Sequence, residues 1–169
     1  MGIEDEAPIY RLFGPKEVCA LRERTVNVDS GQWTHVPFAT DLLEITAGGL
    51  GPCLGVLVYN HDNKDTVAGH FSSPLVHQAE DFDAMLSAAA EAFAQSSRLS
   101  IFVGGCCEDN VIDGKKALKV RASVEKKIAT WAVAHWAKGI AILVTKWPRH
   151  DEEGTNLSIL PDSGLVDTK

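Results

Sequence analysis

Short apolar runs and two amphipathic stretches divide the chain into predicted strands and helices. Apolar residues recur at steps of three or four over residues 81–95 and 118–137, which predicts two amphipathic helices. Apolar or alternating runs bounded by Gly, Pro, Asn or Asp predict strands around them. The predicted strands cover residues 24–28, 42–46, 54–59, 66–71, 99–103, 140–144, 157–160 and 165–166.

The order of these elements predicts the fold class. Strands precede a first helix, one strand separates the two helices, and further strands follow, which is typical of an α+β or α/β layer fold. At 169 residues the chain has the length of one ordinary domain. No apolar run approaches the roughly 18 residues of a membrane span, so we expect no membrane insertion.

Charge and cysteine content narrow the classes of function. The chain has 16 basic and 23 acidic residues, a net charge of −7, which repels a phosphate backbone, so nucleic acid is not expected as a partner. The first six residues include three acidic ones and no basic one, whereas a signal peptide would begin with a basic segment, so a cytoplasmic location is expected. The four cysteines form no Cys-x-x-Cys pair, which favours reduced thiols with a catalytic or metal-binding role.

The candidate chemistry lies in a predicted hairpin. The glycine-rich turn at residues 47–52 leads to Cys53, and the returning strand contains His70. A thiol becomes a strong nucleophile as the thiolate, and an imidazole close by promotes that form. Glycine turns can also aim N–H groups at an oxyanion, although Pro52 has no N–H to give. Spacing alone leaves a second interpretation open, in which Cys53 packs as a small hydrophobe.

A metal site is the other interpretation of the same residues. Cys53 and His70 could bind zinc together with His61 or His77, but these positions lack the close paired spacing of structural zinc sites. Neither a metal nor any other cofactor is therefore expected. Cys106 and its neighbour Cys107 are interpreted as packing residues.

Two motifs make the chain resemble the CheD family of chemoreceptor glutamine deamidases. Gly-Leu-Gly-Pro-Cys at residues 49–53 resembles the family's Gly-x-Gly-Ser-Cys turn. Gly-His-Phe-Ser-Ser-Pro at residues 69–74 resembles its Asn-His-x-x-x-Pro segment, with the family's cysteine-to-histidine spacing. Fainter similarity follows at residues 102–106 and 162–166.

The resemblance implies an α+β single domain in which sandwich-like sheet layers are flanked by two main helices. The deamidase domain would cover residues 41–169, with residues 1–40 as an N-terminal extension packed on it. The implied activity converts a protein glutamine to glutamate with release of ammonia, and for some receptors it includes ester hydrolysis. The implied partners are a glutamine-bearing protein substrate and a chemotaxis phosphatase, to which the chain would bind as an adaptor.

The family pattern also implies roles for individual residues. Cys53 would be the nucleophile and His70 the base, and Gly51, Leu54 and Gly69 would contact the substrate. The family has a threonine six positions before its cysteine, where this chain has Ala47; a one-residue shift would let Thr46 orient the imidazole. The alternatives are an effector or toxin deamidase that acts on a host protein, and a catalytically weak adaptor.

Overall fold

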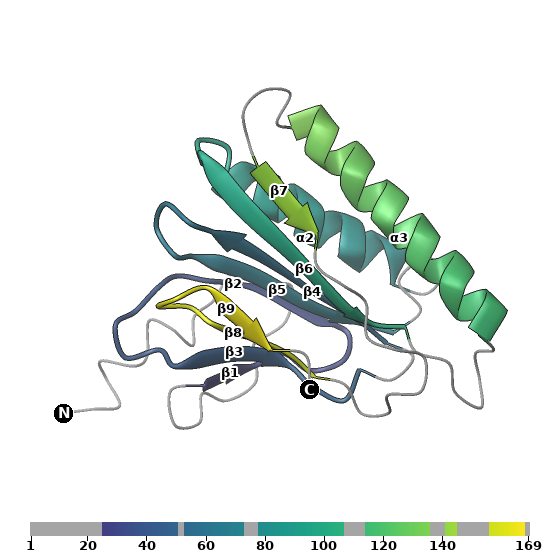
Figure 1. Ribbon diagram of the computed structural model, residues 1–169, viewed down its shortest axis with the longest axis horizontal. Helices are drawn as coiled ribbons and strands as arrows, with labels where there is room; N and C mark the ends of the chain where they lie inside the picture. The colour runs from purple at the N-terminus through teal and green to yellow at the C-terminus, as the bar shows by residue number, and fades with distance from the viewer. Residues whose placement is uncertain are drawn as a thin grey trace.

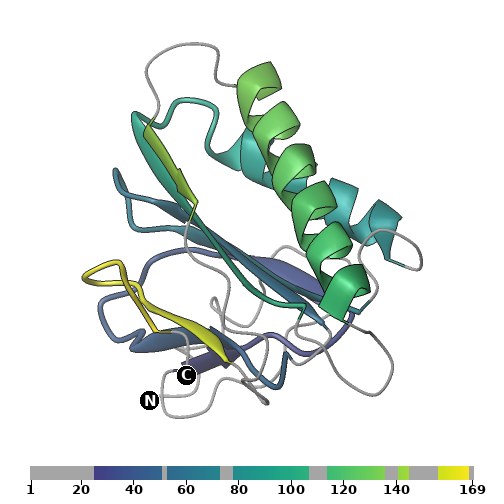
Figure 2. The same cartoon turned by 45° about the vertical axis from the view of Figure 1, so that its right-hand side comes forward.

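The computed structural model describes residues 25–50, 53–72, 78–106, 114–135, 141–144 and 156–167. Within these ranges nine strands form two sheets, and two helices lie on the same face of the larger sheet (Figure 1). The smaller sheet covers the opposite face, so the layers follow the order helices, larger sheet, smaller sheet (Figure 2). The expected α+β fold is confirmed.

The larger sheet has the strand order β2-β5-β4-β6-β7. Its strands are β2 (Gln32–Val36), β5 (Thr66–Phe71), β4 (Leu54–Asn60), β6 (Arg98–Gly105) and β7 (Ala141–Val144). All neighbours are antiparallel except β6 and β7, which run parallel after the crossover through the second helix. The predicted hairpin of β4 and β5 is therefore confirmed, and it lies at the centre of this sheet.

The smaller sheet has the strand order β1-β3-β8-β9. Its strands are β1 (Thr25–Asn27), β3 (Glu44–Ala47), β8 (Leu157–Leu160) and β9 (Leu165–Asp167). β1 is an edge strand parallel to β3, and the other neighbours are antiparallel. The expected edge strand and the expected closing hairpin are both present.

The two helices are α2 (Ala79–Ala92) and α3 (Gly114–His135), which begin and end within a few residues of the predicted limits. They are joined at one point by the Trp131 indole, whose Nε1–H donates to the Leu86 carbonyl over 2.8 Å. His135, one turn further along α3, is exposed. Neither described helix has the length and apolar character to cross a membrane.

Buried side chains form two clusters, one on each face of the larger sheet. Along β4, Leu54 and Val56 pack with the helices, whereas Leu57 and Tyr59 pack against the smaller sheet. Both faces of β4 are therefore buried, and this is why its sequence is a continuous apolar run instead of an alternating one.

β2 was not anticipated from the sequence. Its Trp33 and Thr34 are both buried although they are neighbours, so the strand shows no alternation of buried and exposed positions. Both β1 and β2 precede residue 40, the expected boundary between the N-terminal extension and the domain. β1 belongs to the smaller sheet and β2 to the larger sheet, so this segment supplies one strand to each. Residues 1–24 lie outside the described ranges.

Candidate functional site

Cys53 lies in a tight turn at the start of β4. Its N–H donates to the carbonyl of Leu50, and Gly49 within the same turn has a left-handed backbone with φ +64°. Its carbonyl accepts a hydrogen bond of 2.8 Å from the N–H of Cys106 at the end of β6. The half-buried Cys53 is therefore fixed through both of its backbone polar groups.

The strand register places Cys53 and His70 on the same face of the larger sheet. His70 lies opposite Gly55, and Cys53 precedes that glycine by two positions, so the two side chains are diagonal neighbours. Such neighbours have Cα atoms about 7–8 Å apart, within reach of an imidazole ring. Cys53 packs against the cluster between the two sheets, the same layer to which Ala68 of β5 belongs. Over Gly55 lies the side chain of Leu50, whose Cδ1 is 2.8 Å from the place that a Cβ on this glycine would take.

His70 is buried and is held by a backbone carbonyl. Its Nδ1 lies 3.2 Å from the carbonyl oxygen of Val28, and the residue is 4% exposed. A carbonyl can only accept, so Nδ1 carries the proton and Nε2 presents its lone pair. Nε2 is buried and has no hydrogen-bond partner in the described part of the chain.

Burial lowers the pKa of His70 below its usual value of 6.5. The hydrogen bond to Val28 and the negative charge of Asp29 oppose this shift without reversing it. The imidazole is therefore neutral near pH 7, which is the protonation state of a general base.

Thr46 is not brought to the imidazole. Its neighbours Ile45 and Ala47 face the buried cluster between the sheets, so Thr46 points to the outer face of β3. There its hydroxyl accepts a hydrogen bond of 2.7 Å from the hydroxyl of Ser158. The one-residue shift that would let Thr46 orient His70 is absent.

Val28 takes the orienting position instead. Its carbonyl binds His70, and its N–H donates to the carbonyl of Thr46 over 2.8 Å. Thr46 therefore supports the imidazole through its backbone, with Val28 between them. A backbone carbonyl leaves no signal in the residue type, so the sequence could not indicate this contact.

The expected substrate contacts are placed away from the Cys53 side chain. Leu54 is fully buried in the cluster under the helices. Gly69 faces the same layer, where an added Cβ would lie 2.5 Å from Met85 Sδ and from a Phe71 ring carbon. Gly51, the third expected contact, lies outside the described residues.

An oxyanion donor is a further requirement of acyl chemistry. The N–H of Cys53 is already bonded to Leu50 in this turn, and Pro52 before it has no N–H. For Cys53 to supply the donor, the bond to Leu50 has to open when substrate binds.

The residues considered for zinc do not gather. His61 lies beyond the far end of β4, where its Nε2 is 2.7 Å from the hydroxyl of Ser100, and His77 lies outside the described ranges. No group of three or more His, Cys, Asp or Glu side chains that could hold a metal occurs among the described residues.

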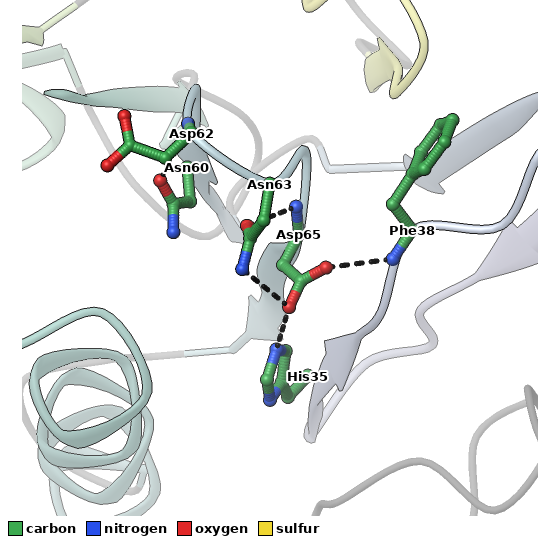
Figure 3. Close-up of polar contacts among 6 residues, drawn as sticks. All are labelled: His35, Phe38, Asn60, Asp62, Asn63 and Asp65. Carbon is green, nitrogen blue, oxygen red and sulfur yellow. Dashed lines mark hydrogen bonds and ion pairs between the residues drawn. The ribbon is translucent and has the colours of Figure 1, made fainter. Parts of the chain in front are cut away.

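A second imidazole site, which the sequence did not point to, lies where the β4–β5 turn meets β2. The carboxylate of Asp65 accepts from the Phe38 N–H at 2.9 Å and from Asn63 Nδ2 at 3.2 Å, and His35 Nε2 lies 3.3 Å from it (Figure 3). Burial raises the pKa of Asp65, but the hydrogen bonds from His35 and Phe38 outweigh burial, and the pKa is lowered overall. These contacts tie the turn to β2.

Comparison with protein-family models gives no match for this chain, and comparison with curated proteins gives none either.

Proposed function

We propose that the protein is a cysteine-dependent protein-glutamine deamidase with Cys53 as nucleophile and His70 as base. The observation that carries the proposal is that Cys53, just before β4, and His70 of the adjacent β5 lie toward the same face of the larger sheet. The imidazole is neutral, and its Nε2 has no hydrogen-bond partner among the described residues. The resemblance of residues 49–53 and 69–74 to the CheD motifs supplies the reaction class.

The proposed reaction uses each group twice. Nε2 of His70 takes the thiol proton of Cys53, and the thiolate attacks the carboxamide carbon of a glutamine side chain. The tetrahedral intermediate collapses as the imidazolium returns this proton to the nitrogen, which leaves as ammonia. The imidazole then removes a proton from water, which attacks the thioester and releases glutamate and the thiol. The net change is one amide and one water converted to one acid and one ammonia.

The resemblance suggests a chemoreceptor as the substrate, and hydrolysis of glutamyl methyl esters would need the same nucleophile and base. An effector that deamidates a host protein would use the same chemistry, so the two differ in target and not in mechanism. The cytoplasm is the compartment in which a chemoreceptor target would be met.

A catalytically weak adaptor is the second candidate. The bond from the Cys53 N–H to Leu50 favours it, because this bond occupies the donor closest to the thiol. Such an adaptor would bind a chemotaxis phosphatase without turnover.

Intact-mass measurement separates the two candidates. Candidate glutamine-bearing proteins are incubated with the wild type, with Cys53→Ala, and with Cys106→Ala as a matched control that removes a different thiol. We expect the mass increase of amide-to-acid conversion with the wild type and Cys106→Ala, and none with Cys53→Ala. Conversion that persists in Cys53→Ala would refute the nucleophile, and phosphatase binding without conversion of any target would favour the adaptor.

Thiol reactivity tests the site without any substrate. Iodoacetamide labelling below neutral pH, followed by peptide mapping, should modify Cys53 faster than Cys19, Cys106 or Cys107, because an imidazole partner is proposed for Cys53 alone. Equally slow labelling of all four would contradict the proposal.

A further inference from the structure

Arg121 of α3 reaches the backbone that holds Cys53. Its Nε donates to the carbonyl of Cys106 over 3.1 Å, and its Nη2 makes a longer contact of 3.4 Å with the carbonyl of Gly105. The residue is 7% exposed, although arginine is rarely buried. It lies on the same face of α3 as the buried Val124 and Ile128. If packing were the only requirement at this position, an apolar residue would meet it.

One peptide unit connects Arg121 with Cys53. The carbonyl of Gly105 and the N–H of Cys106 belong to the same planar peptide group. The carbonyl accepts from Arg121, and the N–H donates to the carbonyl of Cys53 over 2.8 Å. The orientation of this peptide group therefore determines where the Cys106 N–H points, and with it the hydrogen bond that the Cys53 carbonyl accepts.

The backbone at this peptide unit is unusual. Gly105 has φ +86°, and Cys106 has φ +51°, a left-handed conformation that cysteine rarely adopts. Lys64 is the other non-glycine residue with positive φ in the described part of the chain. Such conformations persist where the surroundings hold them, and the two carbonyls bound by Arg121 are those of the two left-handed residues.

The approach of the backbones is also close. A Cβ placed on Gly105 would lie 1.9 Å from the carbonyl oxygen of Cys53. Strand β6 and the cysteine turn therefore meet with no room for a side chain. A shift of the end of β6 would move the carbonyl of Cys53, and the thiol with it.

We propose that Arg121 is a positioning residue for Cys53, acting through the peptide unit that joins Gly105 to Cys106. This inference rests on the proposed function, because it assigns a role at the same cysteine. The guanidinium fork holds the end of β6 so that the Cys106 N–H fixes the Cys53 backbone and keeps the thiol beside His70. A lysine at this position would keep the charge but lose the planar fork.

The pH profile of Cys53 alkylation tests this role. The rate of iodoacetamide modification is measured by peptide mapping for the wild type, Arg121→Lys and Arg121→Met. Val124→Ala is the matched control. It removes buried contacts from the same face of α3, but it keeps the Arg121 guanidinium and its hydrogen bonds to β6. All four proteins are assayed in buffer where circular dichroism shows them folded.

We expect Arg121→Lys and Arg121→Met to slow Cys53 alkylation near pH 7 by about fivefold or more and to move the profile to higher pH, since the imidazole partner is less well aligned. Val124→Ala should keep the wild-type profile even though it loses stability. A wild-type profile in Arg121→Lys, or an equal shift in Val124→Ala, would overturn the inference. If Arg121→Met does not fold, Arg121→Lys decides alone.

The outcome is independent of whether a glutamine substrate is found. If the wild type converts no target but the Arg121 variants shift the alkylation profile, the deamidase proposal fails and the positioning role stands. If conversion occurs and the variants leave the profile unchanged, the positioning role fails and the deamidase proposal stands.

Discussion

His70 and His35 lie on neighbouring strands, yet their surroundings differ in every respect that matters for acid–base chemistry. His70 faces the smaller sheet, is 4% exposed and binds a neutral carbonyl. His35 lines the helix side, where its ring meets Phe93 edge-on with centroids 5.6 Å apart, and it pairs with the carboxylate of Asp65. One imidazole is buried between the two sheets, and the other links a turn to a strand.

The difference shows which surroundings suit a general base. Burial beside a neutral acceptor fixes the tautomer of His70 and lowers its pKa, so the lone pair on Nε2 is available near neutral pH. At the other site Asp65 accepts the hydrogen bonds of three groups, among which His35 is one (Figure 3). Asp65 lies in the turn between β4 and β5. The length of β4, roughly 20 Å by strand geometry, separates this turn from Cys53.

Replacing each histidine in turn gives the largest expected contrast. His70→Gln should slow alkylation of Cys53 near pH 7 by about tenfold or more and abolish turnover of a glutamine substrate, because the thiol loses its base. His35→Gln should leave the labelling rate of Cys53 unchanged. The measurement is iodoacetamide labelling followed by peptide mapping, and equal losses in the two variants would remove the distinction between the sites.

Gly69→Ala should have the next largest effect, on stability. An added Cβ meets Met85 Sδ and the Phe71 ring at 2.5 Å, so overpacking should cost about 1–3 kcal/mol in the free energy of unfolding. The matched control is Gly104→Ala in β6, where the added Cβ finds ordinary contacts of 3.5 Å or more. Urea unfolding measures both, and a Gly104→Ala variant that loses as much as Gly69→Ala would contradict the packing argument.

The two sites should also respond to different ranges of pH. The pKa of His70 is lower in the folded chain, so the unfolded chain takes up the proton first, and stability should fall as the pH drops below the usual value of 6.5. The pKa of Asp65 is also lowered by folding, so its contribution is present above the usual 3.8 and is lost as the pH falls through the folded value.

Unfolding by urea at a series of pH values checks these signs. His70→Gln should flatten the decline between about pH 7 and 5, and Asp65→Asn should flatten the decline below about pH 4. His61 also has a pKa lowered by burial, and it contributes equally to the wild type and both variants. A wild-type pH profile in His70→Gln would contradict the buried neutral imidazole.

Thr46→Val should have the smallest effect. It removes the hydrogen bond from Ser158 on the outer face of β3, which should cost about 1 kcal/mol or less. Labelling of Cys53 should be unchanged, because the backbone of residue 46 still accepts from Val28. Slower labelling in this variant would show that the hydroxyl orients His70 after all.

Much of the fold could be predicted from local pattern. The β4–β5 hairpin, both helices and the closing hairpin follow from apolar runs, helical spacing and turn residues. β2 could not be found in this way, because Trp33 and Thr34 are buried on opposite faces of the sheet and its pairing with β5 is decided by tertiary contacts.

The side chains of the candidate site could be proposed from the sequence, whereas the backbone groups that hold them could not. Cys53 and His70 emerge from turn chemistry and strand spacing, whereas the groups that hold them are carbonyls and N–H groups that every residue type carries. Thr46 illustrates the limit. Its hydroxyl fits the orienting role, but the alternation along β3 turns it to the wrong face.

The carbonyl of Val28 has a consequence for how this protein tolerates change. Because the acceptor is a main-chain oxygen, replacing the Val28 side chain tests packing alone, and an alanine scan would pass over one of the closest contacts of His70. A chain trimmed to residues 41–169 would instead lose that oxygen together with β1 and β2. The apparent boundary of the domain is therefore the wrong place to cut, since the segment before it completes the surroundings of the histidine.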